Sequence, residues 1–125
     1  MTQQDIIKAI NSSPMNRGLN GADWFERPGN VSINIDEDVF LFDYENEGVY
    51  MIHFLSTAGG KDTIKRAKQA FQIMFDGGAS LLIGLVPLDR RDVALMARWV
   101  GGKRRETVPT PYGPCDLYCV LKGNI

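Results

Sequence analysis

The sequence has few of the residues from which metal sites and nucleophile sets are built. Its 125 residues include one histidine, His53, and two cysteines, Cys115 and Cys119. A single imidazole with two thiols does not make a zinc site, and one histidine would have to serve every role in a Ser-His-Asp or Cys-His set. Two cysteines four residues apart in one strand lie about 13 Å apart, beyond disulfide reach. We therefore expect no metal, and two free, half-buried thiols.

Long apolar runs and a strong net charge are also missing. No run of 18 apolar residues occurs, so no membrane span is predicted. The start, MTQQDIIKAI, has neither the basic nor the apolar region of a signal peptide, which favours a cytoplasmic protein. A net charge of −1 argues against a dedicated nucleic-acid binder, although Arg90, Arg91, Arg98, Lys103, Arg104 and Arg105 form a basic cluster.

The composition that remains is that of one soluble domain, residues 1–125, with 44% hydrophobic and 23% charged residues. Its charge is uneven. Residues 1–60 carry three basic and nine acidic residues, a net −6, whereas residues 61–125 carry a net +5. This suggests a polarised surface, whose positive part would suit a phosphate-bearing ligand.

The stretch from Tyr50 to Asp76 organises the chain. An apolar run, Tyr50 to Leu55, predicts a buried strand. Gly59 and Gly60 then allow a sharp turn, and a helix opens at Lys61 with five apolar residues at spacings of three and four: Ile64, Ala67, Phe71, Met74 and Phe75. A strand, a glycine turn and a helix N-terminus leave free N–H groups where an anion can bind, but glycine also makes such turns for purely structural reasons.

The other elements follow from periodicity and from turn residues. Residues 1–30 form an N-terminal helix and loop, and residues 31–122 form a sheet core. Met15 to Gly29 is predicted as a loop, with room for one short helical turn, that Trp24 and Phe25 pin to the core. Asp36 to Asp38 and Glu45 to Gly48 are predicted turns. We expect helices at Gln3–Ile10, capped by Thr2, and at Arg90–Val100, capped by Asp89; the further strands are Val31–Ile35, Val39–Tyr44, Val49–Leu55, Ser80–Val86, Arg104–Val108 and Asp116–Leu121.

This order, an α/β mixed sheet flanked by helices, resembles the fold of the GCN5-related N-acetyltransferases (GNAT) over roughly residues 31–122. In that family the central strand, its following loop and the next helix hold acetyl-coenzyme A, with the pyrophosphate on loop amides at the helix N-terminus. The resemblance implies acetyl-coenzyme A as cofactor and a binding segment made of Leu55, Ser56, Thr57, Gly59, Gly60, Lys61, Asp62 and Thr63.

Two family motifs differ in this chain. The pyrophosphate loop of the family reads Gln/Arg-x-x-Gly-x-Gly/Ala, and Gly59 and Gly60 do not keep that spacing. Aligning Ala94 and Gly102 with the second motif puts Arg98 where many members have a tyrosine general acid. Because arginine does not release its proton near neutral pH, the resemblance leaves that role to Tyr112 or Tyr118, or to no residue.

The whole chain is also similar to the small head-assembly proteins of P22-like short-tailed phages, with MNRGLNGADWF contributing most. This similarity implies partners among phage virion or assembly proteins and a place in the host cytoplasm or the virion. The main prediction is therefore a phage virion (head) assembly protein that uses an acetyltransferase-like fold as an assembly or chaperone surface. The alternative is an acetyl-coenzyme A-dependent N-acetyltransferase acting on an amine of a phage or host protein.

His53 is the candidate catalytic residue. An imidazole can act as a general base near neutral pH, but a lone histidine on an apolar strand is equally explained as a packed, hydrogen-bonded core residue. Asp43, Glu45 and Glu47 lie around the predicted hairpin tip next to it. They could attract or deprotonate an amine, or they could be solvated hairpin charges.

Overall fold

The computed structural model describes residues 2–12, 20–36, 38–55 and 61–124. Two helices come first, α1 (Gln3–Ser12) and α2 (Gly21–Glu26), followed by the strands β1 (Val31–Ile35), β2 (Asp38–Asn46) and β3 (Val49–Leu55). The second half contains α3 (Lys61–Asp76), β4 (Leu81–Pro87), α4 (Arg91–Trp99), β5 (Lys103–Val108), β6 (Cys115–Leu121) and a 3-10 turn at Lys122–Asn124. None of the helices in these ranges is long and apolar enough to cross a membrane.

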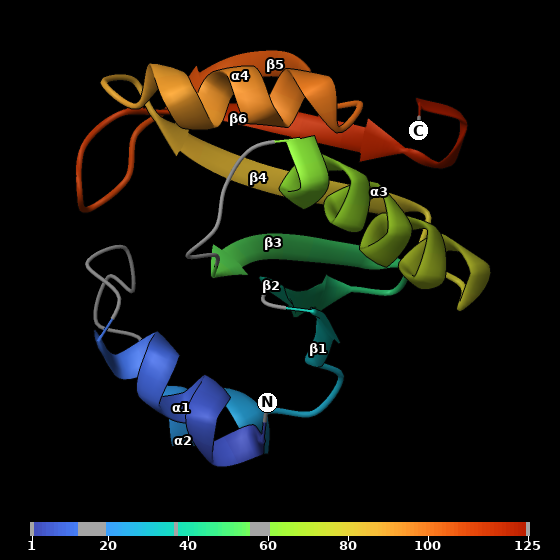
Figure 1. Cartoon of the computed structure of the whole chain (residues 1–125). Helices are drawn as coiled ribbons and strands as arrows, with labels where there is room; N and C mark the ends of the chain where they lie inside the picture. The colour runs from blue at the N-terminus through green and yellow to red at the C-terminus, as the bar shows by residue number, and fades with distance from the viewer. Residues whose placement is uncertain (1, 13–19, 37, 56–60, 125) are drawn as a thin grey trace.

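The strands form one mixed sheet in the order β1-β2-β3-β4-β6-β5 (Figure 1). Among the strands in the described ranges, only β3 and β4 pair in parallel, as expected for two strands joined by the crossover helix α3. Their pairing covers three steps, from Val49 opposite Leu81 to Met51 opposite Ile83. By contrast β2 stays paired with β3 up to Leu55, and β6 stays paired with β4 up to Pro87. The sheet therefore separates into two wings beyond Met51 and Ile83.

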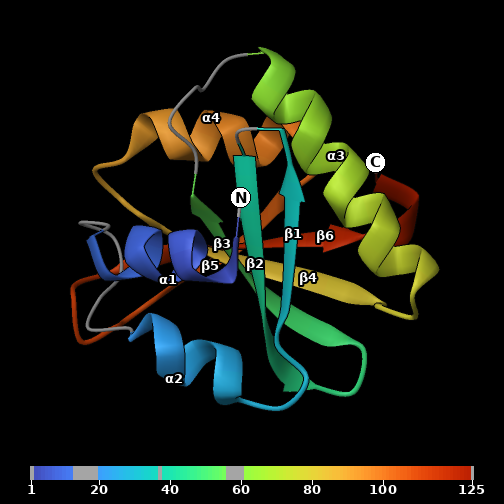
Figure 2. The same ribbon diagram turned by 60° about the horizontal axis from the view of Figure 1, so that its bottom comes forward.

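Alternate residues of β2 serve two hydrophobic cores on opposite faces of the sheet. Phe40 and Phe42 belong to the larger core, which also contains the apolar face of α3. Val39 and Leu41 belong to a smaller core that α1 and α2 build with Ile6, Ile10 and Trp24. Figure 2 shows α1 and α2 on one side of the β1–β2 wing and α3 on the other. Helices thus cover both faces of the β1–β2 wing.

The helix predictions for the N-terminal part are confirmed in part. Thr2 caps α1 as expected, because its hydroxyl accepts a hydrogen bond from the Asp5 amide at 3.2 Å, and the Asp5 carboxylate accepts from the Thr2 amide at 3.0 Å. The region predicted as a loop contains α2, whose first turn is capped by the Asn20 side chain. Trp24 is buried, as predicted. Gly21 is required at this crossing, since a Cβ there would lie 2.8 Å from the Ile7 carbonyl oxygen.

Three further predictions need correction. Asp38 is not in a turn but is the first residue of β2. The hairpin loop is shorter than expected, because β2 continues to Asn46. The predicted cap of α4 is wrong: Arg90 occupies the N-cap position, its side chain pairs with Asp92 and does not cap the helix, and Asp89 is exposed. The other predicted helices and strands are present, with ends that differ by one or two residues.

Candidate functional site

The point where β3 and β4 separate is the structural centre of the candidate site. Beyond Met51 and Ile83, within the described part of the chain, the facing edges of the two strands are not paired with each other. Figure 1 shows the ends of β3 and β4 diverging toward the side where α4 begins. Backbone groups on such edges can hydrogen-bond an extended ligand, as an added strand would. The separation therefore offers backbone groups in the interior of the sheet to a ligand.

The predicted cofactor segment begins at this separation, and the structure describes part of it. Leu55 is the last residue of β3 and is paired with Val39. Residues 56–60, which include Ser56, Thr57, Gly59 and Gly60, lie outside the described residues. Lys61 and Asp62 are the first two residues of α3, and Asp62 is exposed. The N-terminus of a 16-residue helix therefore follows the open end of β3, as an anion site at that terminus requires.

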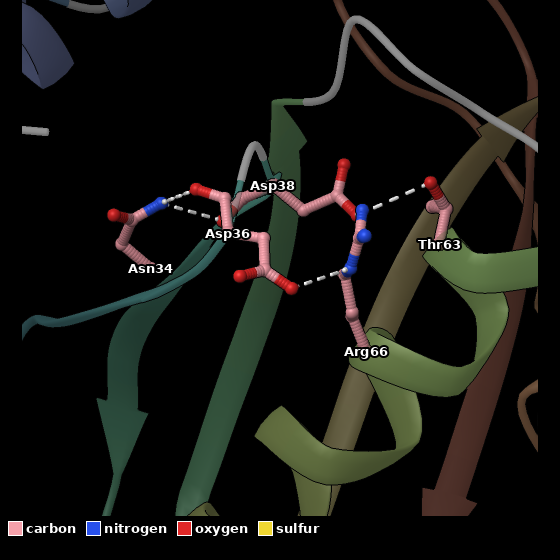
Figure 3. A network of polar contacts seen from close by, with 5 residues as sticks. All are labelled: Asn34, Asp36, Asp38, Thr63 and Arg66. Carbon is pink, nitrogen blue, oxygen red and sulfur yellow. Dashed lines mark hydrogen bonds and ion pairs between the residues drawn. The ribbon is translucent and has the colours of Figure 1, made fainter.

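Thr63, the last residue of that segment, is fully buried and takes part in a polar network (Figure 3). Its hydroxyl donates to the Asp38 carboxylate at 3.1 Å, and Arg66 donates to the same oxygen at 3.2 Å. Arg66 also lies 3.3 Å from the Asp36 carboxylate, while the Asn34 amide donates to the carbonyl oxygens of Asp36 and Asp38. The bond to Asp38 raises the pKa of Arg66, against the opposing effect of burial. The network fastens the first turns of α3 to the β1–β2 turn.

His53 lies on the opposite face of the sheet, at the edge of the α1–α2 core. Its Nε2 atom lies 2.6 Å from Oδ2 of Asp43, and Trp24 Nε1 donates to Oδ1 of the same carboxylate. Asp43 is buried, with 8% of its side chain exposed, whereas 31% of the His53 side chain is exposed. The structure thus brings together a strand histidine, a neighbouring strand carboxylate and a helix tryptophan, with the imidazole as the accessible member.

The ionisation of Asp43 determines what the imidazole can do. Burial works to raise the pKa of Asp43, but the hydrogen bond and charge of His53, with the bond from Trp24, lower it overall. Asp43 is therefore ionised near neutral pH and can only accept hydrogen bonds. Nε2 of His53 must then carry a hydrogen, which leaves Nδ1 of the neutral ring as the basic nitrogen. Such a histidine–carboxylate pair is the arrangement of an oriented general base.

The position of Asp43 corrects one expectation and fills a gap in the sequence reasoning. Asp43 is not at the hairpin tip but inside β2, opposite Met51 and diagonal to His53. Glu45 and Glu47 are exposed, in agreement with solvated hairpin charges. Asn30 holds Trp24 in place. The side-chain nitrogen of Asn30 donates to the Trp24 carbonyl oxygen at 2.9 Å, and its side-chain oxygen accepts from the backbone N–H of Tyr44 at 2.9 Å. The sequence predicted Trp24 only as an anchor of its loop.

Neither candidate tyrosine lies on the His53 face in a buried position. Tyr118 is buried on β6 opposite Gly84, beneath the end of α4, where it would touch a Cβ added to Gly102. Tyr118 lies between Leu117 and Cys119, which point to the face of His53. Because side chains alternate along a strand, Tyr118 points to the opposite face, where α3 and α4 pack. Tyr112 is 64% exposed in the loop between β5 and β6. Among the described residues, no group of three or more His, Cys, Asp or Glu side chains is arranged to hold a metal ion.

No family model and no curated protein matches the sequence. Solved structures do match the fold. An aminoglycoside acetyltransferase, AAC(6')-Ib, in complex with coenzyme A and kanamycin, has a TM-score of 0.72 at 16% identity, covering 99% of this chain and 93% of that one. A spermidine N-acetyltransferase, SpeG, from Vibrio cholerae, in a chimera with hSSAT, has a TM-score of 0.73 at 8% identity, covering 98% and 94%.

A ribosomal-protein-alanine acetyltransferase from Vibrio fischeri matches with a TM-score of 0.59 at 7% identity, covering 67% of this chain and 53% of that one. At these identities the similarity establishes the fold and not the activity. The three proteins are named for different amine acceptors, so the fold alone does not specify the acceptor of this chain. The mixed six-stranded sheet flanked by helices is the GNAT acyl-CoA N-acyltransferase fold, as the resemblance of residues 31–122 predicts.

Proposed function

We propose that this chain is an N-acetyltransferase that moves an acetyl group from acetyl-coenzyme A to an amine, with His53 as the general base. The observation that carries the proposal is the Trp24–Asp43–His53 set, in which α2 and β2 hold the histidine of β3, the strand whose end separates from β4. A buried, ionised carboxylate that holds a histidine with 31% of its side chain exposed is an arrangement typical of functional sites. The solved structures with coenzyme A or acetyl-coenzyme A on the same fold add support.

The described residues fit acetyl-coenzyme A in two respects. The open edges of β3 and β4 provide unpaired backbone groups for an amide-containing arm, and the α3 N-terminus provides a positive dipole end for a pyrophosphate. Within the predicted segment, the Thr63 hydroxyl already donates a hydrogen bond to Asp38. We therefore assign Thr63 the role of positioning α3 and not of contacting the cofactor. Leu55, Lys61 and Asp62, together with residues 56–60, remain the proposed binding segment. Bound acetyl-coenzyme A would supply the acetyl group as a reactive thioester.

In the proposed reaction, His53 acts on the acceptor. Its Nδ1 accepts the proton that the amine nitrogen loses as the N–C bond replaces the C–S bond, and the departing thiolate takes a proton from water. Asp43 stabilises the imidazolium that forms and holds Nε2 as the protonated nitrogen. Positioned proton transfer of this kind contributes roughly 10²–10⁴-fold to a rate.

The test combines titration calorimetry with release of free coenzyme A thiol. We expect acetyl-coenzyme A to bind at micromolar concentration, and Gly60→Glu in the proposed loop to remove that binding. His53→Gln should bind the cofactor normally but lose about 10²–10⁴-fold in kcat, while Glu45→Gln, an exposed carboxylate on the same hairpin, should stay within twofold. Absence of binding at millimolar cofactor would refute the proposal, and a fully active His53→Gln would remove His53 from it.

The phage head-assembly role stays a prediction. None of the solved structures compared above is named as a virion protein, and no described contact favours assembly over acetyl transfer. The two roles are compatible in one respect, because a phage or host protein could be the acceptor.

A further inference from the structure

The sheet face that carries His53 continues as an apolar surface across the separation. On this face Met51 lies directly opposite Ile83, and Ile83 lies opposite Cys119. One step further along the strands, Leu85 lies opposite Leu117. Residues opposite one another in register point to the same face of a sheet, and His53 is two residues beyond Met51 on β3. We call Met51, Ile83, Leu85, Leu117 and Cys119 the apolar floor.

Within the described residues, neither of the two helix-covered cores includes a residue of the apolar floor. α3 and the end of α4 pack on the other face, and α1 and α2 pack against Val39 and Leu41 of β2 (Figure 2). All five floor residues are half-buried, and none belongs to either core described above. Inward-facing positions of a sheet are normally apolar because something covers them. The floor is therefore a surface that a ligand or partner can complete.

We infer that the acceptor is a polypeptide amine flanked by apolar side chains, which lie on this floor while the amine meets His53. The inference rests on the proposed function. The floor is continuous with His53 and crosses from β3 to β6, two strand spacings, or about 10 Å. That length corresponds to about three extended residues, more than the reacting side chain itself needs.

The chemistry of the floor selects against the other classes of amine. Its five side chains contain no charge and no strong hydrogen-bonding group. A polyhydroxylated or polycationic amine placed there would lose hydrogen bonds to water without replacement. A peptide with apolar residues next to the amine gains by burying them.

The experiment compares two synthetic peptides of equal length and charge, each with one reactive lysine amine. One carries Leu and Val on both sides of the lysine, and the other carries Ser and Asn there. With acetyl-coenzyme A and the full chain, we expect kcat/KM to be at least about tenfold higher for the apolar peptide, mainly through KM. Leu117→Gln should remove most of this preference. Leu121→Gln, four residues along the same strand and 50% exposed, should leave it unchanged.

A second measurement uses the wild-type chain, so it does not depend on a variant that folds. Cys119 is a half-buried free thiol in the floor, and Cys115 is buried. Saturating apolar peptide should slow alkylation of Cys119 at least about fivefold, whereas the polar peptide at the same concentration should not.

The outcomes separate the inference from the proposed function. Equal acetylation of both peptides, or acetylation of a small polar amine with neither peptide used, overturns the inference and leaves the acetyltransferase intact. A stable dimer in solution that protects Cys119 without peptide also overturns it, since a second copy then covers the floor. Absence of transfer to every amine tested overturns the proposed function, and the inference with it.

Discussion

Two buried carboxylates of β2, Asp38 at its start and Asp43 within it, show how similar chemistry serves different purposes. Asp38 is fully buried and accepts hydrogen bonds from Thr63 and Arg66 on the α3 face. Asp43 is nearly as buried and accepts from Trp24 and pairs with His53 on the α1–α2 face. Each carboxylate joins its strand to a helix. The two carboxylates differ in the chemistry of the partner that is exposed to water, which is Arg66 for Asp38 and His53 for Asp43.

The partners of Asp38 cannot exchange protons near neutral pH, because a threonine hydroxyl and an arginine do not titrate there. The partner of Asp43 is an imidazole, a group that can serve as a general base, and 31% of the His53 side chain is exposed. Burial and ion pairing of a carboxylate therefore do not identify a catalytic site by themselves. An accessible group that titrates in the working pH range, held by that carboxylate, is the stronger indicator.

The largest expected effect on stability comes from breaking the Asp38 network. Asp38→Ala removes the acceptor of Thr63 and one partner of Arg66 at a fully buried position. We expect the free energy of unfolding to fall by about 3 kcal/mol, and Asp38→Asn, which keeps one acceptor oxygen, to cost about half as much. Urea unfolding at pH 7 measures both. A cost below about 1 kcal/mol for Asp38→Ala would mean that the network does not hold α3.

The Asp43→Asn variant should show the opposite balance, with more effect on activity than on stability. The amide nitrogen of asparagine can donate to Nε2 of His53 and so move the ring hydrogen to Nδ1, which removes the proposed base. We expect roughly a 10²-fold loss in kcat with a stability cost of about 1–3 kcal/mol. Steady-state kinetics and urea unfolding on the same preparation test this. A variant that loses stability but keeps its kcat would make Asp43 structural, as Asp38 is.

The fold was predictable because its longest signals are local. Four of the five residues at helical spacing in α3, Ala67, Phe71, Met74 and Phe75, are buried as predicted. The α2 helix was predicted as no more than one short turn within a loop because its signals are weak: it has six residues and begins with glycine, and its packing on the sheet through Trp24 is not visible in the local sequence. The prediction that Asp89 caps α4 was wrong because the sequence does not fix the first residue of a helix to within one position, and the helix begins one residue later than predicted.

The site was only half predictable. His53 could be named because it is the single histidine, but its partner requires the register of the β2–β3 hairpin. The bulge between Tyr44 and Asn46 shifts that register by one residue and so puts Asp43 on the face of His53 and diagonal to it. Alternation counted from the turn alone would place Asp43 on the other face, so this pair does not follow from the sequence. Nor does the contact of Trp24, because α2 reaches Asp43 by tertiary packing across 19 residues of sequence. The Asp38–Thr63 contact, 25 residues apart, is equally non-local.

The pH dependence of stability should separate Asp43 from an asparagine in its place. The pKa of Asp43 in the folded protein is lowered, so its ionised form stabilises the fold above the ordinary aspartate range, and this contribution is lost as the pH falls through the folded-state pKa. The difference in unfolding free energy between wild type and Asp43→Asn should therefore shrink as the pH falls below about 4. A difference that does not change with pH would mean that Asp43 is not ionised in the fold.

The smallest effect is expected for an arginine–carboxylate pair that is exposed. Arg104 lies 3.1 Å from Asp116, much as Arg66 lies 3.2 Å from Asp38, but 48% of the Arg104 side chain and 20% of that of Asp116 are exposed. The bonds from Thr107 and Arg104 lower the pKa of Asp116, yet water screens such a pair and competes for its partners. Arg104→Ala should therefore leave the urea midpoint unchanged within error. A loss as large as that of Asp38→Ala would show that ion pairing itself, and not burial, sets the strength of both contacts.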